Sequence, residues 1–113
     1  MDNHITAERI ADILLAKNIV YEQKRMFGGD CFMVDDKMCL GTYKNGLMAR
    51  IGPEAADVLT ERPGASQMMH AGRTMVGYLF IESEGYERDS DLSFWVEQCL
   101  AFNPKAKKTK KKV

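Results

Sequence analysis

The sequence predicts a two-layer α+β domain in which a largely antiparallel sheet packs against helices, in the order α-β(3)-α-β(2)-α. Apolar residues recur at helical spacing near both ends of the chain, and extended segments rich in β-branched and aromatic residues lie between them. Asn45-Gly46 sits between two such segments, a combination typical of a β-hairpin, so at least part of the sheet is antiparallel. We expect the domain to span residues 1–103, with a disordered, lysine-rich tail at 104–113.

The first element is predicted to be a helix over residues 7–17. Ile10, Ile13 and Leu14 follow at steps of three and four residues, which places them on one face that a core would bury. Thr6 is the expected N-cap, because its hydroxyl can accept a hydrogen bond from an unpaired backbone N–H of the first turn. Asn18 tolerates a left-handed conformation and is expected to end the helix.

Residues 19–51 are predicted to be extended, and we count three strands before the next helix. Gly28-Gly29 interrupts this region. A phosphate-binding loop would lead into a helix, whereas strand-like residues follow here and Asp30 would repel an anion. A tight turn or a bulge is therefore the favoured interpretation of the two glycines.

The Asn45-Gly46 hairpin carries a prediction of register. If these two residues form the loop, Leu40 pairs with Ile51, and paired residues share a face of the sheet. The predicted core face then holds Leu40, Leu47, Ala49 and Ile51, whereas Tyr43, Met48 and Arg50 point the other way.

The second half of the chain is predicted to hold two helices and two strands. Pro53 suits the first turn of a helix. Residues 68–70 and 75–81 are expected to be extended, and the last helix is expected to run from Asp89 to about Phe102, where Asn103-Pro104 stops it. We expect Trp95, on the apolar face of this helix, to be buried against the sheet beside Phe80 or Tyr78.

Charge is unevenly placed along a chain whose formal net charge is zero. Residues 1–104 hold ten basic and 16 acidic side chains, and six further lysines lie between positions 105 and 112. No apolar run approaches the roughly 18 residues of a membrane-spanning helix, and the first residues lack the pattern of a signal peptide. Three cysteines without a C-x-x-C pair are typical of buried or inert thiols in a reducing cytoplasm.

Two groups of basic residues are candidates for nucleic-acid binding. The tail lysines could neutralise phosphates, and a strand surface with arginines near Tyr43 and Tyr78 could bind phosphates through its cations and bases through its rings. The alternative is that these cations face water and pair with the many carboxylates. The candidates are Lys105, Lys107, Lys108, Lys110, Lys111 and Lys112 in the tail and Lys24, Arg25, Arg50 and Arg73 in the domain.

No combination of residues predicts catalysis. Cys31 or Cys39 with His70 is a conceivable nucleophile and base, but no spacing supports the pairing and no third group orients it. The only histidines, His4 and His70, are far apart in the sequence and do not form a zinc-binding pattern. We therefore expect no catalytic residue, no metal site and no cofactor.

Four segments of the chain resemble the TfoX N-terminal domain family, also called TfoX/Sxy. They are Lys24-Arg25-Met26-Phe27-Gly28-Gly29, Lys37-Met38-Cys39-Leu40, Leu47-Met48-Ala49-Arg50-Ile51 and Gly72-Arg73-Thr74-Met75-Val76-Gly77-Tyr78. The similarity extends over nearly the whole domain, from Thr6 to Asn103. The resemblance implies the element order given above and a regulator of competence gene expression that acts with the transcription machinery at promoters. It implies no catalytic residues.

Together these features predict a cytoplasmic, non-enzymatic regulatory module that is linked to transcription and makes weak nucleic-acid contact through its basic tail. The alternative is a protein-interaction or dimerisation module, including a homodimer, that does not bind nucleic acid. An uncharacterised enzyme is a third possibility. We expect no association with a membrane.

Overall fold

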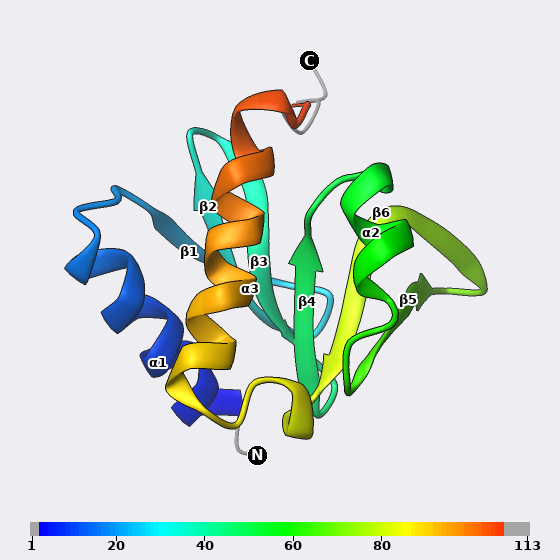
Figure 1. Cartoon of the computed structure of the whole chain (residues 1–113). Coiled ribbons are helices and arrows are strands. Elements are labelled where there is room, and N and C mark those ends of the chain that lie inside the picture. Colours follow the sequence, from blue (N-terminus) through cyan, green and yellow to red (C-terminus); the bar gives the residue numbers. More distant parts are fainter. Residues whose placement is uncertain (1–2, 108–113) are drawn as a thin grey trace.

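The computed structural model describes residues 3–107, which form a six-stranded antiparallel sheet with three α-helices on one of its faces (Figure 1). The predicted α+β class is confirmed. The elements are α1 (Asn3–Ala16), β1 (Glu22–Met26), β2 (Gly29–Val34), β3 (Lys37–Tyr43), β4 (Gly46–Arg50), α2 (Pro53–Leu59), β5 (Ala65–His70), β6 (Arg73–Glu82), the 3₁₀ helix η1 (Ser83–Gly85), α3 (Asp89–Phe102) and the 3₁₀ helix η2 (Asn103–Lys105).

The strands lie in the order β1-β2-β3-β4-β6-β5, and among the strands of residues 3–107 only the β4–β6 pair joins strands that are not consecutive in the chain. Four strands rather than the predicted three precede α2. The reason is that Phe27 (φ 56°) and Gly28 (φ 77°) reverse the chain within the first extended region. The predicted tight turn is present, but it consists of Phe27 and Gly28. Gly29 is already the first residue of β2, where a Cβ would collide with the carbonyl oxygen of Thr42.

The predicted register of the β3–β4 hairpin is wrong by two residues. The two-residue loop lies one position earlier than predicted, and Leu40 pairs with Ala49 instead of Ile51. A side chain on Gly46 would collide with the Phe80 ring of β6, so this glycine serves close packing between strands rather than the turn. A shift of two residues keeps each side chain on its face, and the predicted core face is confirmed.

The helices follow the predictions except at the start of α1. This helix is already present at Asn3, so Thr6 lies inside it as a buried residue, and the prediction of an N-cap at Thr6 is wrong. α2 begins at Pro53, as predicted. α3 spans the predicted range. No helix within residues 3–107 is both long enough and apolar enough to cross a membrane.

The sheet separates two apolar cores. The first lies between the sheet and the helices and holds Trp95, which is fully buried as predicted. The second lies on the other face and is built from strand residues alone: Cys31, Met33, Met38, Tyr43, Met48 and Met68. Phe80 and Tyr78 pack against the second core, so the prediction that one of them lies beside Trp95 is wrong.

The sheet curls over its second core. Phe27, in the β1–β2 loop, and His70, at the end of β5, come from opposite edges of the sheet, yet their ring centroids are 4.9 Å apart. The Nδ1 atom of His70 also lies 3.0 Å from the hydroxyl of Tyr43. The two end hairpins therefore approach each other and bury this face of the sheet. The three α-helices lie on the other face (Figure 1).

The first residues of the predicted tail belong to the folded domain. η2 follows α3 directly, and Ala106 after it is buried. The folded chain thus continues past the predicted boundary at residue 103 as far as Lys107, the last described residue. The other tail lysines, Lys108, Lys110, Lys111 and Lys112, lie outside the described residues.

Candidate nucleic-acid interface

The helices and the strands differ in charge. In the described residues, α1, α2 and α3 together hold seven carboxylates and one arginine, whereas the six strands hold five basic residues and three carboxylates. The helical layer therefore repels an anion, and an anion meets the least opposition on the strand side of the molecule.

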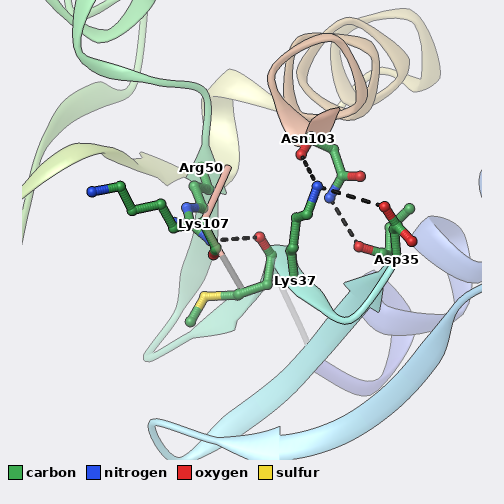
Figure 2. Close-up of polar contacts among 7 residues, drawn as sticks. Asp35, Lys37, Arg50, Asn103 and Lys107 are labelled. Atoms are coloured by element: carbon green, nitrogen blue, oxygen red, sulfur yellow. Dashed lines mark hydrogen bonds and ion pairs between the residues drawn. The ribbon is translucent and has the colours of Figure 1, made fainter. Parts of the chain in front are cut away.

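Arg50 lies at the end of β4 on the same face of the sheet as Tyr78, its partner on β6. Its guanidinium carbon is 5.5 Å from the centre of the Tyr78 ring and 6.0 Å from the centre of the Phe102 ring. Its NH1 group donates to the carbonyl oxygens of Met38 and Lys107, each at 3.4 Å (Figure 2). Arg50 thus lies near two aromatic rings, and its hydrogen bond to Lys107 places it where the lysine-rich segment follows α3.

A hollow of about 330 Å³ opens beside Arg50. Tyr78 and Phe102 give it aromatic walls, Val76 adds an exposed apolar side chain, and Arg50, Lys105 and Lys107 give it positive charge. No acidic residue is among the described side chains that line it. The residues around this hollow combine cations with rings, which is the combination that sequence analysis expected on a nucleic-acid-binding surface.

Lys37 fixes the position of the chain that carries these lysines. Its buried ammonium group donates to the carbonyl of Asn103 at 3.1 Å and lies 3.5 Å from a carboxylate oxygen of Asp35 (Figure 2). The side-chain amide of Asn103 donates in turn to the carbonyl of Val34 at 3.0 Å. The end of α3 is thereby tied to the β2–β3 hairpin, and a cation lies at the negative end of the helix.

The structure separates the other predicted cations of the domain. Strand alternation places Lys24 and Arg73 on the same face as Arg50 but near opposite edges of the sheet, and it places Arg25 on the face toward the helices. Arg25 lies 3.6 Å from Asp30, and Lys24 lies 3.7 Å from Glu22. Arg73 is exposed at the start of β6. These three residues do not join the hollow.

Of the two tyrosines expected near the arginines, the structure brings only Tyr78 to Arg50. Tyr43 is buried, with its hydroxyl against His70. Phe102 and Val76 were not predicted as site residues. Phe102 carried a usable signal, because it ends a helix three residues before the first tail lysine, but nothing in the sequence singled out Val76.

The cysteines are buried, as predicted. Burial raises the pKa of Cys31 to about 12, with a further rise from the neighbouring Cys39 and a partial reduction by Lys24. Burial also raises the pKa of Cys99 well above its usual range. Thiolates are therefore scarce at neutral pH, and these thiols are poor nucleophiles. In the part of the chain described, no three His, Cys, Asp or Glu side chains are grouped to hold a metal ion.

The fold and the hollow define a small α+β domain with a cationic, aromatic surface site. A model of the TfoX N-terminal domain matches residues 14–103, and the chain therefore belongs to the TfoX N-terminal domain family. This match confirms the resemblance carried by the four sequence segments, all of which lie within it. No curated protein and no solved structure matches the chain.

Proposed function

We propose that this chain is a non-enzymatic regulatory module, linked to transcription, that contacts nucleic acid through its lysine-rich C-terminal segment and the neighbouring Arg50. The observation that carries the proposal is the convergence of Arg50, Lys105 and Lys107 on one hollow that also presents two aromatic rings. The resemblance to regulators of competence gene expression supports the link to transcription.

The distribution of charge supports a polyanion as the partner. The carboxylates of the helical layer repel a nucleic acid from one side of the domain, whereas the lysines of residues 105–112, which follow α3, attract it. Lysines that neutralise phosphates release counterions and carry no sequence information, so the contact is sequence-independent and strongly dependent on salt.

A titration of a labelled duplex at about 50 mM and about 200 mM salt tests the proposal. If all six tail lysines neutralise phosphates, the slope of log affinity against log salt is roughly −5, and replacing Lys108, Lys110, Lys111 and Lys112 with glutamine reduces its magnitude by about 3 to 4. The control is Lys17→Gln with Lys44→Gln, which removes two lysines outside the hollow and should change the slope little per lysine removed.

The outcomes separate the proposed surfaces. Equal slopes for the intact protein and the tail variant would contradict a role for the four replaced lysines and would leave Arg50, Lys105 and Lys107 as the remaining contacts. Absence of binding by the intact protein, even at low salt, would contradict nucleic-acid contact altogether.

A protein-interaction module is the second candidate, and the edge strand β5 favours it. Ala65–His70 contains no Asp, Glu, Lys or Arg, and Met69 in it is 47% exposed. Charged side chains protect edge strands from pairing with other chains, and the opposite edge, β1, carries three of them. If β5 pairs with a second copy, light scattering should give a dimer mass that Ser66→Lys, at an exposed position, returns to a monomer.

A further inference from the structure

We propose that the hollow beside Arg50 holds one unpaired nucleotide, so that the protein prefers single-stranded nucleic acid to a duplex. This inference rests on the proposed function and specifies the form of nucleic acid that the site takes.

The walls of the hollow suit a nucleobase. Tyr78 and Phe102 are only partly buried, and both line the same space of about 330 Å³. This volume lies near the lower limit of ligand sites, which hold about 300–1,000 Å³, and it suits one nucleotide rather than a base pair. Any base can stack on an aromatic ring, provided that the base is not already stacked between its neighbours in a nucleic-acid duplex. A duplex therefore reaches the cations of this site without reaching its rings.

The cations of the hollow suit the adjoining phosphates. Both hydrogen bonds of Arg50 come from NH1, so within the described residues its Nε and NH2 groups remain as donors for a phosphate oxygen. Lys105 and Lys107 lie at the same space and add charge. Burial raises the pKa of Tyr78, with a partial reduction by Arg50, so its hydroxyl stays neutral and does not repel the phosphate.

Two hollows adjoin Phe102, and the charges that line them favour one of the two for a nucleotide. A second hollow, of about 270 Å³, lies against Phe102 and Lys105 and is lined in addition by Glu54. The carboxylate opposes a phosphate there, whereas the hollow beside Tyr78 has no described acidic lining. The anionic ligand is thus directed to the side of Phe102 that holds Arg50.

Hydrogen bonds within the protein hold the backbone that lines the hollow in place. The amides of Ile51 and Gly52 both donate to the carbonyl of Gly77, at 2.9 and 3.0 Å. A Cβ on Gly77 (φ 85°) would press against Gly52 and Pro53 at 3.3 Å, so glycine permits this close approach of β6 to the end of β4. A preformed site loses little entropy on binding.

The experiment compares a short labelled oligothymidine with a duplex by fluorescence anisotropy. Intact protein should bind the single strand more tightly, and Tyr78→Leu should weaken single-strand binding about 5- to 100-fold while leaving duplex binding nearly unchanged. Tyr78→Phe is the matched control, because it keeps the ring and removes only the hydroxyl, and it should bind as the intact protein does. The circular dichroism of each variant shows whether the fold is kept.

Val76 provides a second test that does not depend on Tyr78 variants folding. Val76 is 69% exposed and lines the hollow, so both Val76→Glu and Val76→Gln are expected to fold. The glutamate should weaken single-strand binding several-fold more than the glutamine, because only the glutamate places a negative charge beside the phosphates.

Each outcome bears on one of the two proposals. Equal affinity for both nucleic acids, with no effect of Tyr78→Leu or Val76→Glu, would overturn the single-strand site and leave the proposed function standing if the tail variant still weakens binding. An equal loss for both nucleic acids in Tyr78→Leu would also overturn it. Failure to bind either form at low salt would overturn both proposals.

Discussion

Trp95 joins α3 to the sheet both by packing and by a hydrogen bond. Its ring is fully buried in the first core, and its Nε1 donates to the carbonyl of Gly85 at 3.0 Å. We expect Trp95→Ala to lower the free energy of unfolding by about 3–5 kcal/mol, because it removes the ring and leaves a cavity. A urea titration followed by circular dichroism measures the change. A loss below about 1 kcal/mol would show that this ring is not an anchor of the core.

Gly28 in the β1–β2 turn and Gly29 at the start of β2 differ in what an added side chain would meet. Nothing lies within 4 Å of a Cβ placed on Gly28, whose φ is 77°, whereas a Cβ on Gly29 would collide with the backbone of Thr42. We expect Gly29→Ala to lower the free energy of unfolding by about 1–3 kcal/mol through overpacking. Gly28→Asn should cost less, because asparagine tolerates the left-handed conformation. Thermal melts of both variants provide the comparison, and equal losses would contradict it.

At the scale of elements, the end of α3 is joined to the β2–β3 hairpin by the buried ammonium group of Lys37 and by the side-chain amide of Asn103, which donates to Val34. We expect Lys37→Met to lower the free energy of unfolding by about 1–3 kcal/mol, because methionine fills the space but removes the charged donor to the carbonyl of Asn103, which then accepts only from the amide of Ala106. The protection of α3's last amides against hydrogen exchange should fall as well. Lys17→Met is the control: it breaks an exposed ion pair with Glu97, worth about 0–1 kcal/mol. Equal effects of the two substitutions would exclude a special role for Lys37.

The elements that the sequence predicted well are those whose signals are local. α3 begins and ends as predicted, because apolar periodicity marks its face and Asn103-Pro104 stops it. The predicted β3–β4 register is wrong because the prediction places Gly46 in the turn. In the structure, glycine is needed at this position because a side chain would collide with the ring of Phe80, a residue 34 positions later. The same limit applies to the number of strands, since the sequence does not state that Phe27 adopts a positive φ.

In the candidate site too, local sequence patterns predict some features, and contacts between distant residues determine the others. Alternation along β4 correctly placed Arg50 away from the helix-facing core, and pairing with β6 brings it to Tyr78. The hollow itself depends on the packing of Phe102 and on the return of the chain after α3, which no local pattern describes. Tyr43 is not part of the site, because the curl of the sheet places His70 against its hydroxyl group.

At the scale of the whole molecule, one sheet serves as the shared wall of two cores with different construction. The helices cover one face, and the sheet's own curvature covers the other. This arrangement lets about 100 residues build a six-stranded sheet with an apolar core on each face and helices on a single side. The hollow opens at the end of β4, where Arg50 and Tyr78 meet Phe102 at the end of α3.

The single non-consecutive strand pair, β4–β6, has a consequence for the rate of folding. The other pairs are hairpins that close within a few residues, whereas the β4–β6 pair must first order residues 51–72 between its strands. Closing the longer loop costs more entropy, so we expect this pairing to be formed in the transition state and the helices to dock afterwards. Ile81→Val, in β6, should then mainly slow folding, whereas Ile10→Val, in α1, should mainly speed unfolding. The two substitutions are matched, because both positions are fully buried. Stopped-flow measurements of folding and unfolding rates test the expectation. If helix docking came first, Ile10→Val would mainly slow folding and Ile81→Val would mainly speed unfolding.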